Sequence, residues 1–220
     1  MNTPLTLAML LQAFEQHNKT FSPWSWLVYG LAIATLLLAF RPTDLSNRLI
    51  IGFLGFIWLW VGIAFFILTF APIYPLAYLF GALFIVQGLA FLYLAGRAPL
   101  SFGFRTDIYG LIGLLLALFG LVGYPIFGYL MGDSFPQVAI VGAPCPATIL
   151  TFGLLLMTRE RVPWPVLIIP FLWAVSAVVP ISAGMWADVV LLTGGIFGTV
   201  MIIYRDRHRA LAESSIRPAH

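Results

Sequence analysis

The sequence predicts an all-α polytopic membrane protein: a bundle of seven transmembrane helices preceded by a helix that lies on the outer membrane surface. Hydrophobic residues make up 61% of the 220 residues and charged residues only 9%, whereas a soluble domain carries about 25% charged residues. Apolar runs recur along the chain, and a run of about 20 apolar residues is enough to cross a bilayer. The basic residues fall in alternate connecting segments, as they do when they collect on the cytoplasmic side.

Residues 1–22 are expected to form an outer interfacial helix. They show neither the basic start nor the small-residue cleavage site of a signal peptide. Leu5, Met9 and Phe14 recur at roughly helical spacing, which suits a helix lying in the membrane surface. Trp24 and Trp26 follow, where an aromatic belt is expected.

The transmembrane domain is predicted at 23–204. Its seven spans are placed approximately at 23–40, 49–71, 75–95, 108–131, 138–158, 164–181 and 185–204. Pairs of arginines lie in the segments 41–48, 96–107 and 158–163, and four more lie in a basic tail at 205–220. This alternation predicts an outer N-terminus and a cytoplasmic C-terminus.

The fifth span contains an unusual Pro144-Cys145-Pro146 sequence. Proline is tolerated at the first position of a helix and disruptive inside it, so an uninterrupted helix is expected to begin only at Pro146, inside the membrane. Cys145 would then cap a helix whose positive end favours a thiolate or a bound anion. The alternative is a full-length helix that is kinked at the prolines, with Cys145 buried and inert.

Few other polar residues lie within the predicted spans. Gln87 is in the middle of the third span, and Asp188 is about one turn inside the seventh, where a solvated interfacial position is the alternative. Asp133 precedes the fifth span in an outer loop. Asp133, Cys145 and Asp188 are expected to face one outer vestibule, and these residues together with Pro144, Pro146, Thr148 and Gln87 form the candidate solute site.

Several classes of function are disfavoured. No lysine lies in a span, and the three histidines lie in the two tails. A retinal Schiff base, a haem pair and a zinc-protease helix are therefore excluded, and no phosphate-binding loop or nucleophile elbow occurs. We expect no cofactor, no metal and no nucleic-acid partner, and we have no basis for an enzymatic reaction. The expected partners are the lipid bilayer and an unidentified small solute, and the oligomeric state is open.

The segments APCPATILTFGLLL (143–156) and RPTDLSNRLIIGFLGFIWLWVGIAFF (41–66) resemble an uncharacterised family of small bacterial inner-membrane proteins. Its members carry an Ala-Pro-x-Pro-Thr-like motif at the same helix, and the corresponding threonine here is Thr148, one place late. Some members are labelled permeases without a demonstrated substrate. The resemblance implies the membrane topology and a shared motif at Pro144, Cys145 and Pro146, but no activity.

Three functions follow as alternatives. The first is a small-solute permease of the bacterial inner membrane, with an outer vestibule at the broken fifth helix. The second is a structural or accessory membrane subunit, and the third is a membrane enzyme or thiol sensor that uses Cys145. A water-accessible cavity that reaches past Gln87 would favour the permease, whereas a dry bundle would favour the accessory subunit.

Overall fold

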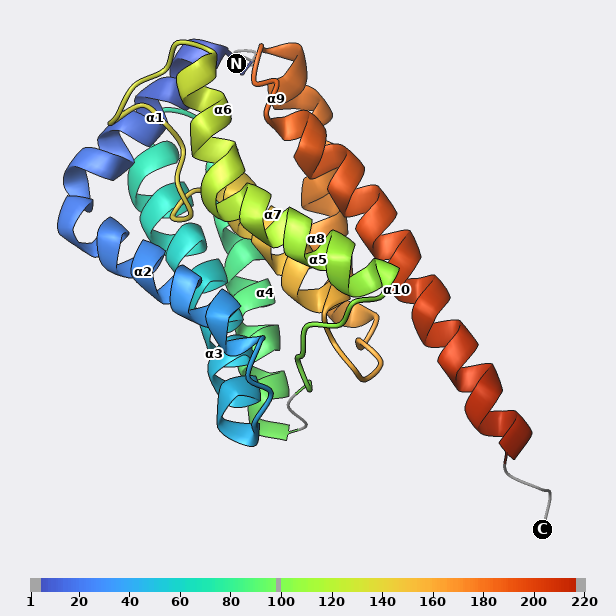
Figure 1. The fold of residues 1–220 in the computed structure, drawn as a ribbon. Coiled ribbons are helices and arrows are strands. Elements are labelled where there is room, and N and C mark those ends of the chain that lie inside the picture. The colour runs from blue at the N-terminus through green and yellow to red at the C-terminus, as the bar shows by residue number, and fades with distance from the viewer. Residues whose placement is uncertain (1–4, 98–99, 217–220) are drawn as a thin grey trace.

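The computed structural model describes residues 5–97 and 100–216, with side chains up to residue 210. In this part of the chain the helices form eight rods, most of them packed side by side (Figure 1). The elements are α1 (Leu7–Thr20), α2 (Ser22–Leu38), α3 (Asp44–Trp60) with η1 (Val61–Phe70), α4 (Ala77–Arg97), α5 (Ile108–Leu118) with η2 (Phe119–Gly123) and α6 (Tyr124–Leu130), α7 (Pro144–Leu156), α8 (Pro165–Ser176) with α9 (Val178–Ser182), and α10 (Asp188–Ile216). The elements η1 and η2 are π-helical continuations of α3 and α5.

The membrane class predicted from the sequence is confirmed, but the number of long helices is smaller than seven. Among the described residues, five helices are long and apolar enough to span a membrane, or six if α1 and α2 are counted as one bent span. The pair bends by 95°, and α2 alone has 17 residues. The predicted span at 138–158 contains only the 13-residue α7. At 1.5 Å per residue α7 reaches about 20 Å, against about 30 Å of hydrocarbon.

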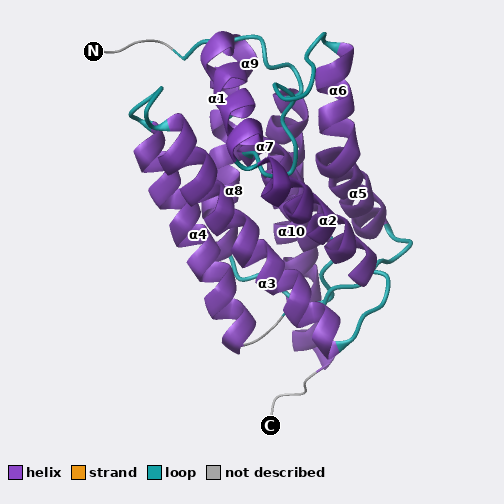
Figure 2. Cartoon of the chain, turned by 90° about the vertical axis from the view of Figure 1, so that its left-hand side faces the viewer, coloured by secondary structure: helices purple, strands orange, loops and turns teal. Residues whose placement is uncertain are grey.

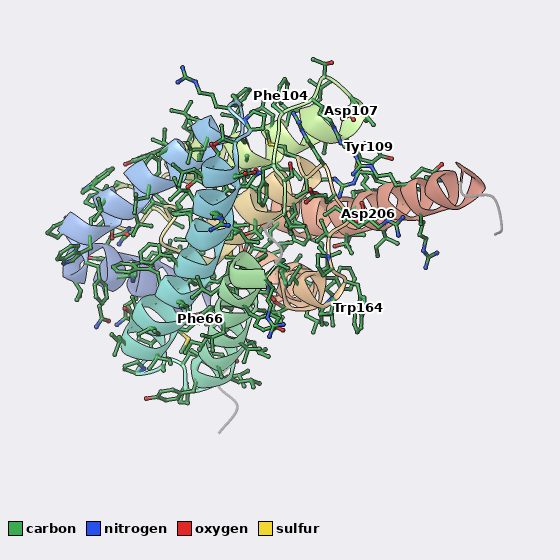
Figure 3. The ribbon with its side chains drawn as sticks, turned by 90° about the horizontal axis from the view of Figure 1, so that it is seen from below. Phe66, Phe104, Asp107, Tyr109, Trp164 and Asp206 are labelled. Carbon is green, nitrogen blue, oxygen red and sulfur yellow. The ribbon has the colours of Figure 1, made fainter. Side chains whose placement is uncertain are left out.

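The connecting segments that carry arginines gather at one end of the bundle, which we call the arginine end. Here Phe102 forms a bridge with Thr158, and the Gly103 amide donates to the Met157 carbonyl at 3.0 Å. In Figure 3, which looks at the bundle from below, Asp107, Tyr109 and Asp206 lie on one side of the molecule and Phe66 lies away from them. Beyond it α10 runs on to Ile216, so much of the predicted basic tail is helical.

The helix α7 forms the centre of the bundle, where it is surrounded by its neighbours (Figure 2). Every residue from Val138 to Thr158 is buried, and α7 packs against α3, α5, η2, α8 and α10. Gly153 makes the contact with α5 possible, because a Cβ atom there would lie 2.6 Å from the Ala117 nitrogen and 2.7 Å from the Gly113 oxygen. Small residues allow helices to approach this closely.

The loop before α7 enters the bundle from the end opposite the arginines (Figure 1). The amide of Asn18, on α1, donates to the carbonyls of Pro136 at 2.7 Å and Val138 at 2.9 Å. The Gln137 side chain donates to Glu15, also on α1, at 3.0 Å. The predicted helix near the N-terminus therefore exists, and its buried face holds the loop that precedes α7. Its position at the membrane surface stays a prediction.

Candidate functional site

Three side chains from different elements meet at the N-terminal end of α7. Asp188, the first residue of α10, is fully buried. The Tyr124 hydroxyl of α6 donates to its Oδ1 atom at 2.6 Å, and the Cys145 thiol of α7 donates to its Oδ2 atom at 3.4 Å. In this structure Asp188 is therefore not the solvated interfacial carboxylate that the sequence allowed as an alternative.

The prolines place the start of α7 and limit what it can bind. The helix begins at Pro144 after the extended residue Ala143, which supports the broken-helix prediction but corrects the predicted start, Pro146, by two residues. The shift is possible because backbone amides of the first turn have no partner within the helix, so a proline there breaks no hydrogen bond. Consequently Cys145 lies within the first turn, not at the cap. Of the first three helical residues, only Cys145 retains an N–H donor.

The carboxylate changes the expected electrostatics of this helix end. When it is ionised, Asp188 supplies a negative charge beside Cys145, so a second anion or a thiolate would be repelled. The prediction of a site for an anion or a thiolate at Cys145 is therefore not supported by the geometry. Within the described part of the chain, no basic side chain forms an ion pair with Asp188. The carboxylate is held only by two neutral donors.

The opposite end of α7 carries the complementary charge. The Arg205 guanidinium is buried and donates from Nη1 to the carbonyls of Leu156 at 2.9 Å and Thr158 at 3.2 Å. It also pairs with Asp206 at 2.8 Å. Because the helix dipole favours an anion at the N-terminus and a cation at the C-terminus, Asp188 and Arg205 both stabilise α7.

A cavity of about 130 Å³ lies against Asp188 and Cys145. We call it the α7 cavity. Its walls are mostly apolar, and their aromatic part comes from α1, η1, α4, α8 and the turn between η1 and α4: Phe14, Phe65, Phe66, Phe70, Tyr74, Phe80 and Trp173. Leu76 and Val179 line it and are exposed, so the cavity meets the surface on their side. The indole nitrogen of Trp173 is buried without a hydrogen-bond partner among the described residues.

A second cavity of about 270 Å³ lies beside the first and is lined by Asp133, Tyr124, Gly128 and Gln137. Phe14 and Met185 line both cavities. The structure therefore places Asp133 apart from Cys145 and Asp188, where the sequence predicted one shared vestibule. Burial raises the pKa of the Asp133 carboxyl above its ordinary value.

Two other candidate residues, Gln87 and Thr148, make hydrogen bonds within the bundle and do not line the α7 cavity. The Gln87 amide donates to the Val166 carbonyl at 3.0 Å and is buried. The Thr148 hydroxyl donates to the Pro144 carbonyl at 2.8 Å, one turn earlier in α7. Pro144 lines the α7 cavity, but Gln87, Thr148 and Pro146 do not.

The sequence did not point to Tyr124 or to the aromatic residues in the wall of the α7 cavity. Tyr124 lies 64 positions from Asp188, and its position in an apolar span gave no sign of a polar partner. A signal was available in the phenylalanines of VGIAFFILTF (61–70), which supply Phe65, Phe66 and Phe70. Among the described residues, no group of three His, Cys, Asp or Glu side chains could hold a metal ion.

Long helices that are apolar enough to span a membrane indicate an integral membrane protein. Residues 7–213 match a family of unknown function, DUF6064, and the chain belongs to that family. No curated protein and no solved structure shows significant similarity to it.

Proposed function

We propose that the protein is a small-solute permease of the bacterial inner membrane and that its solute site is the α7 cavity. The observation that carries this proposal is the buried Asp188 carboxylate in the cavity wall, without a basic partner in the described chain. Ionisable groups within membrane bundles are costly and typically serve a ligand, an ion or a proton. A helix that begins within the bundle is also a common way to build a transporter site.

The orientation belongs to the same proposal. With the arginine end in the cytoplasm, the α7 cavity opens toward the outer side, on the side of Leu76 and Val179. The site would then be reached from outside, and the buried length of α7 would separate it from the cytoplasm.

An accessory membrane subunit is the second candidate, and one observation favours it. The α7 cavity does not reach Gln87. Further toward the arginine end, the rings of Trp58 and Phe84 stack with their centroids 4.3 Å apart, and the Trp58 indole donates to the Thr151 hydroxyl at 3.0 Å. The half of the bundle near the arginine end is therefore closed, so transport requires α7 or its neighbours to move. A subunit that binds a solute without transporting it needs no such motion.

Solute flux into liposomes tests the permease. The purified chain is reconstituted, and stopped-flow light scattering measures swelling in iso-osmotic cationic, neutral and anionic small solutes. The permease predicts faster entry of at least one class than in empty liposomes, and a loss of that gain in Asp188→Asn. Equal entry for every solute in both preparations would leave the accessory subunit as the better account.

A further inference from the structure

The α7 cavity combines one fixed negative charge with walls of a particular kind. Among the described residues, Asp188 accepts hydrogen bonds only from Tyr124 and Cys145, and neither donor carries a positive charge. The two prolines also remove backbone donors that a helix N-terminus normally offers to an anion. A buried carboxylate without a cation is costly, so a positively charged occupant would be stabilised beside it.

The rings of the cavity wall form a continuous surface. Phe66 lies 5.3 Å from Trp173 and 5.3 Å from Phe65 between ring centroids, both edge-to-face. Phe80 also belongs to this surface, with its ring centroid 5.4 Å from that of Trp173. Aromatic faces attract cations, most strongly those of tryptophan, and the attraction is larger in a desolvated site. Quaternary ammonium groups are recognised by clusters of aromatic side chains.

The size and chemistry of the cavity restrict the cation further. A cavity of about 150 Å³ accommodates benzene, so the α7 cavity, at about 130 Å³, suits a ligand of roughly five to seven non-hydrogen atoms. Metal cations such as Ca²⁺ need about six oxygen ligands. The side-chain oxygens of the cavity wall are those of the Asp188 carboxylate and of the Ser176 and Tyr74 hydroxyls, within mostly apolar side chains, and these do not replace a hydration shell.

We propose that the α7 cavity binds a compact organic ammonium ion, with Asp188 as its counter-charge and the Phe65, Phe66, Phe80 and Trp173 rings as its cage. This proposal rests on the α7 cavity being the solute site, and it names the class of solute. The ammonium group replaces the missing positive partner of Asp188, and its alkyl substituents contact the apolar wall.

Isothermal titration calorimetry on the purified full chain in detergent tests the proposal with an isosteric pair. The probes are 2-hydroxyethyl(trimethyl)ammonium and its uncharged carbon analogue 3,3-dimethylbutan-1-ol. We expect the ammonium ion to bind at least about tenfold more tightly than the alcohol, because removing one partner of a buried charge pair has effects of this size or larger. Potassium chloride at the same concentration should not compete.

Variants locate the effect. Asp188→Asn keeps an oxygen that can accept from Tyr124 and should reduce ammonium affinity to that of the alcohol. Trp173→Leu should weaken binding several-fold and Trp173→Phe less, following the strength of the ring faces. Asp44→Asn is the matched control, since Asp44 is an exposed carboxylate at the arginine end. Elution as a single species in size exclusion shows that each variant is folded.

The outcomes separate this proposal from the proposed function. Equal affinity for both probes, unchanged ammonium affinity in Asp188→Asn, competition by potassium, or no binding of the ammonium ion would each overturn the ammonium site. If liposome flux of an uncharged solute then still depends on Asp188, the permease stands with another class of solute. If flux is also absent, both proposals fail.

Discussion

The buried Asp188 carboxylate determines the chemistry at the N-terminal end of α7. Asp188 receives one hydrogen bond from a phenol and one from a thiol, and such bonds from neutral donors are weaker than those from charged ones. The sequence showed that Asp188 was a candidate but could not show its burial, because its depth depends on how α9 and α10 pack.

Similarly, His17 was assigned to a tail, yet it is buried among Phe21, Trp60 and Phe65.

Asp133 should affect stability in a pH-dependent way. Its pKa is raised by burial, so its contribution is greatest below the unfolded pKa and is lost as the pH rises through the folded value. Asp133→Asn cannot ionise, so its stability relative to the native protein should rise as the pH increases above about 4, the ordinary pKa of an aspartic acid, and should then stay constant above the folded pKa. The gain should stay within about 0.5 kcal/mol because the side chain is partly exposed. Thermal unfolding across this range measures it, and a relative loss at neutral pH would contradict the assignment.

Asn18 should be important for the loop before α7. Asn18→Ala removes the donor to the Pro136 and Val138 carbonyls, and buried carbonyls without partners cost about 1–3 kcal/mol. We expect a lower unfolding temperature for this variant. Gln16→Ala on the exposed face of α1 is the control and should change stability by less than about 0.5 kcal/mol. Equal unfolding temperatures for the two variants would show that α1 does not hold the loop.

At the scale of the element, α7 is the part that the sequence predicted best. Two prolines around one residue indicated a helix that starts inside the span, and the structure places that start within two residues of the predicted position. The partners of α7 were not predictable, since a helix buried on all sides lacks an amphipathic pattern that could show which neighbours it meets. The aromatic wall was not predictable either, because its members come from segments that are far apart in the sequence.

The close contact between α7 and α5 gives a test of this packing. In Gly153→Ala the new Cβ atom would meet backbone atoms of Ala117 and Gly113, which cannot rotate away. We expect a loss of about 1–3 kcal/mol, as for other overpacked sites. Gly30→Ala on α2 is the matched control, because nothing lies within 4 Å of a Cβ atom there. Scanning calorimetry of both variants in detergent compares them, and a Gly153→Ala protein as stable as Gly30→Ala would contradict the close approach.

At the scale of the whole molecule, the class was predictable and the count of long helices was not. Composition and arginine spacing were sufficient to predict a membrane bundle, because they reflect the bilayer and not the packing. The count differs at α2, which has 17 residues and follows a sharp bend, and at α7, where a proline pair makes the helix shorter than hydropathy suggests.

The path of the chain leads to a prediction about orientation. The start of α1 and the arginine end lie at opposite ends of the bundle (Figure 1). A reporter fused after Tyr204 should therefore be cytoplasmic, and a tag at Met1 should be cleaved by protease added outside intact cells. Protection of the N-terminal tag in cells where the C-terminal reporter is cytoplasmic would mean that the number of crossings is even.

The central claim is that the head of α7 forms an outward-facing cavity with a negative charge, and Cys145 reports on it directly. Cys145 is the only cysteine in the chain and lines the α7 cavity 3.4 Å from Asp188. Two membrane-impermeant methanethiosulfonates are added outside intact cells, one carrying a trimethylammonium group and the other a sulfonate. Each labelling rate is divided by the rate with a free thiol in solution. The normalised rate should be higher for the cationic reagent, and Asp188→Asn should remove the difference. Equal normalised rates, or labelling only after denaturation, would contradict the account.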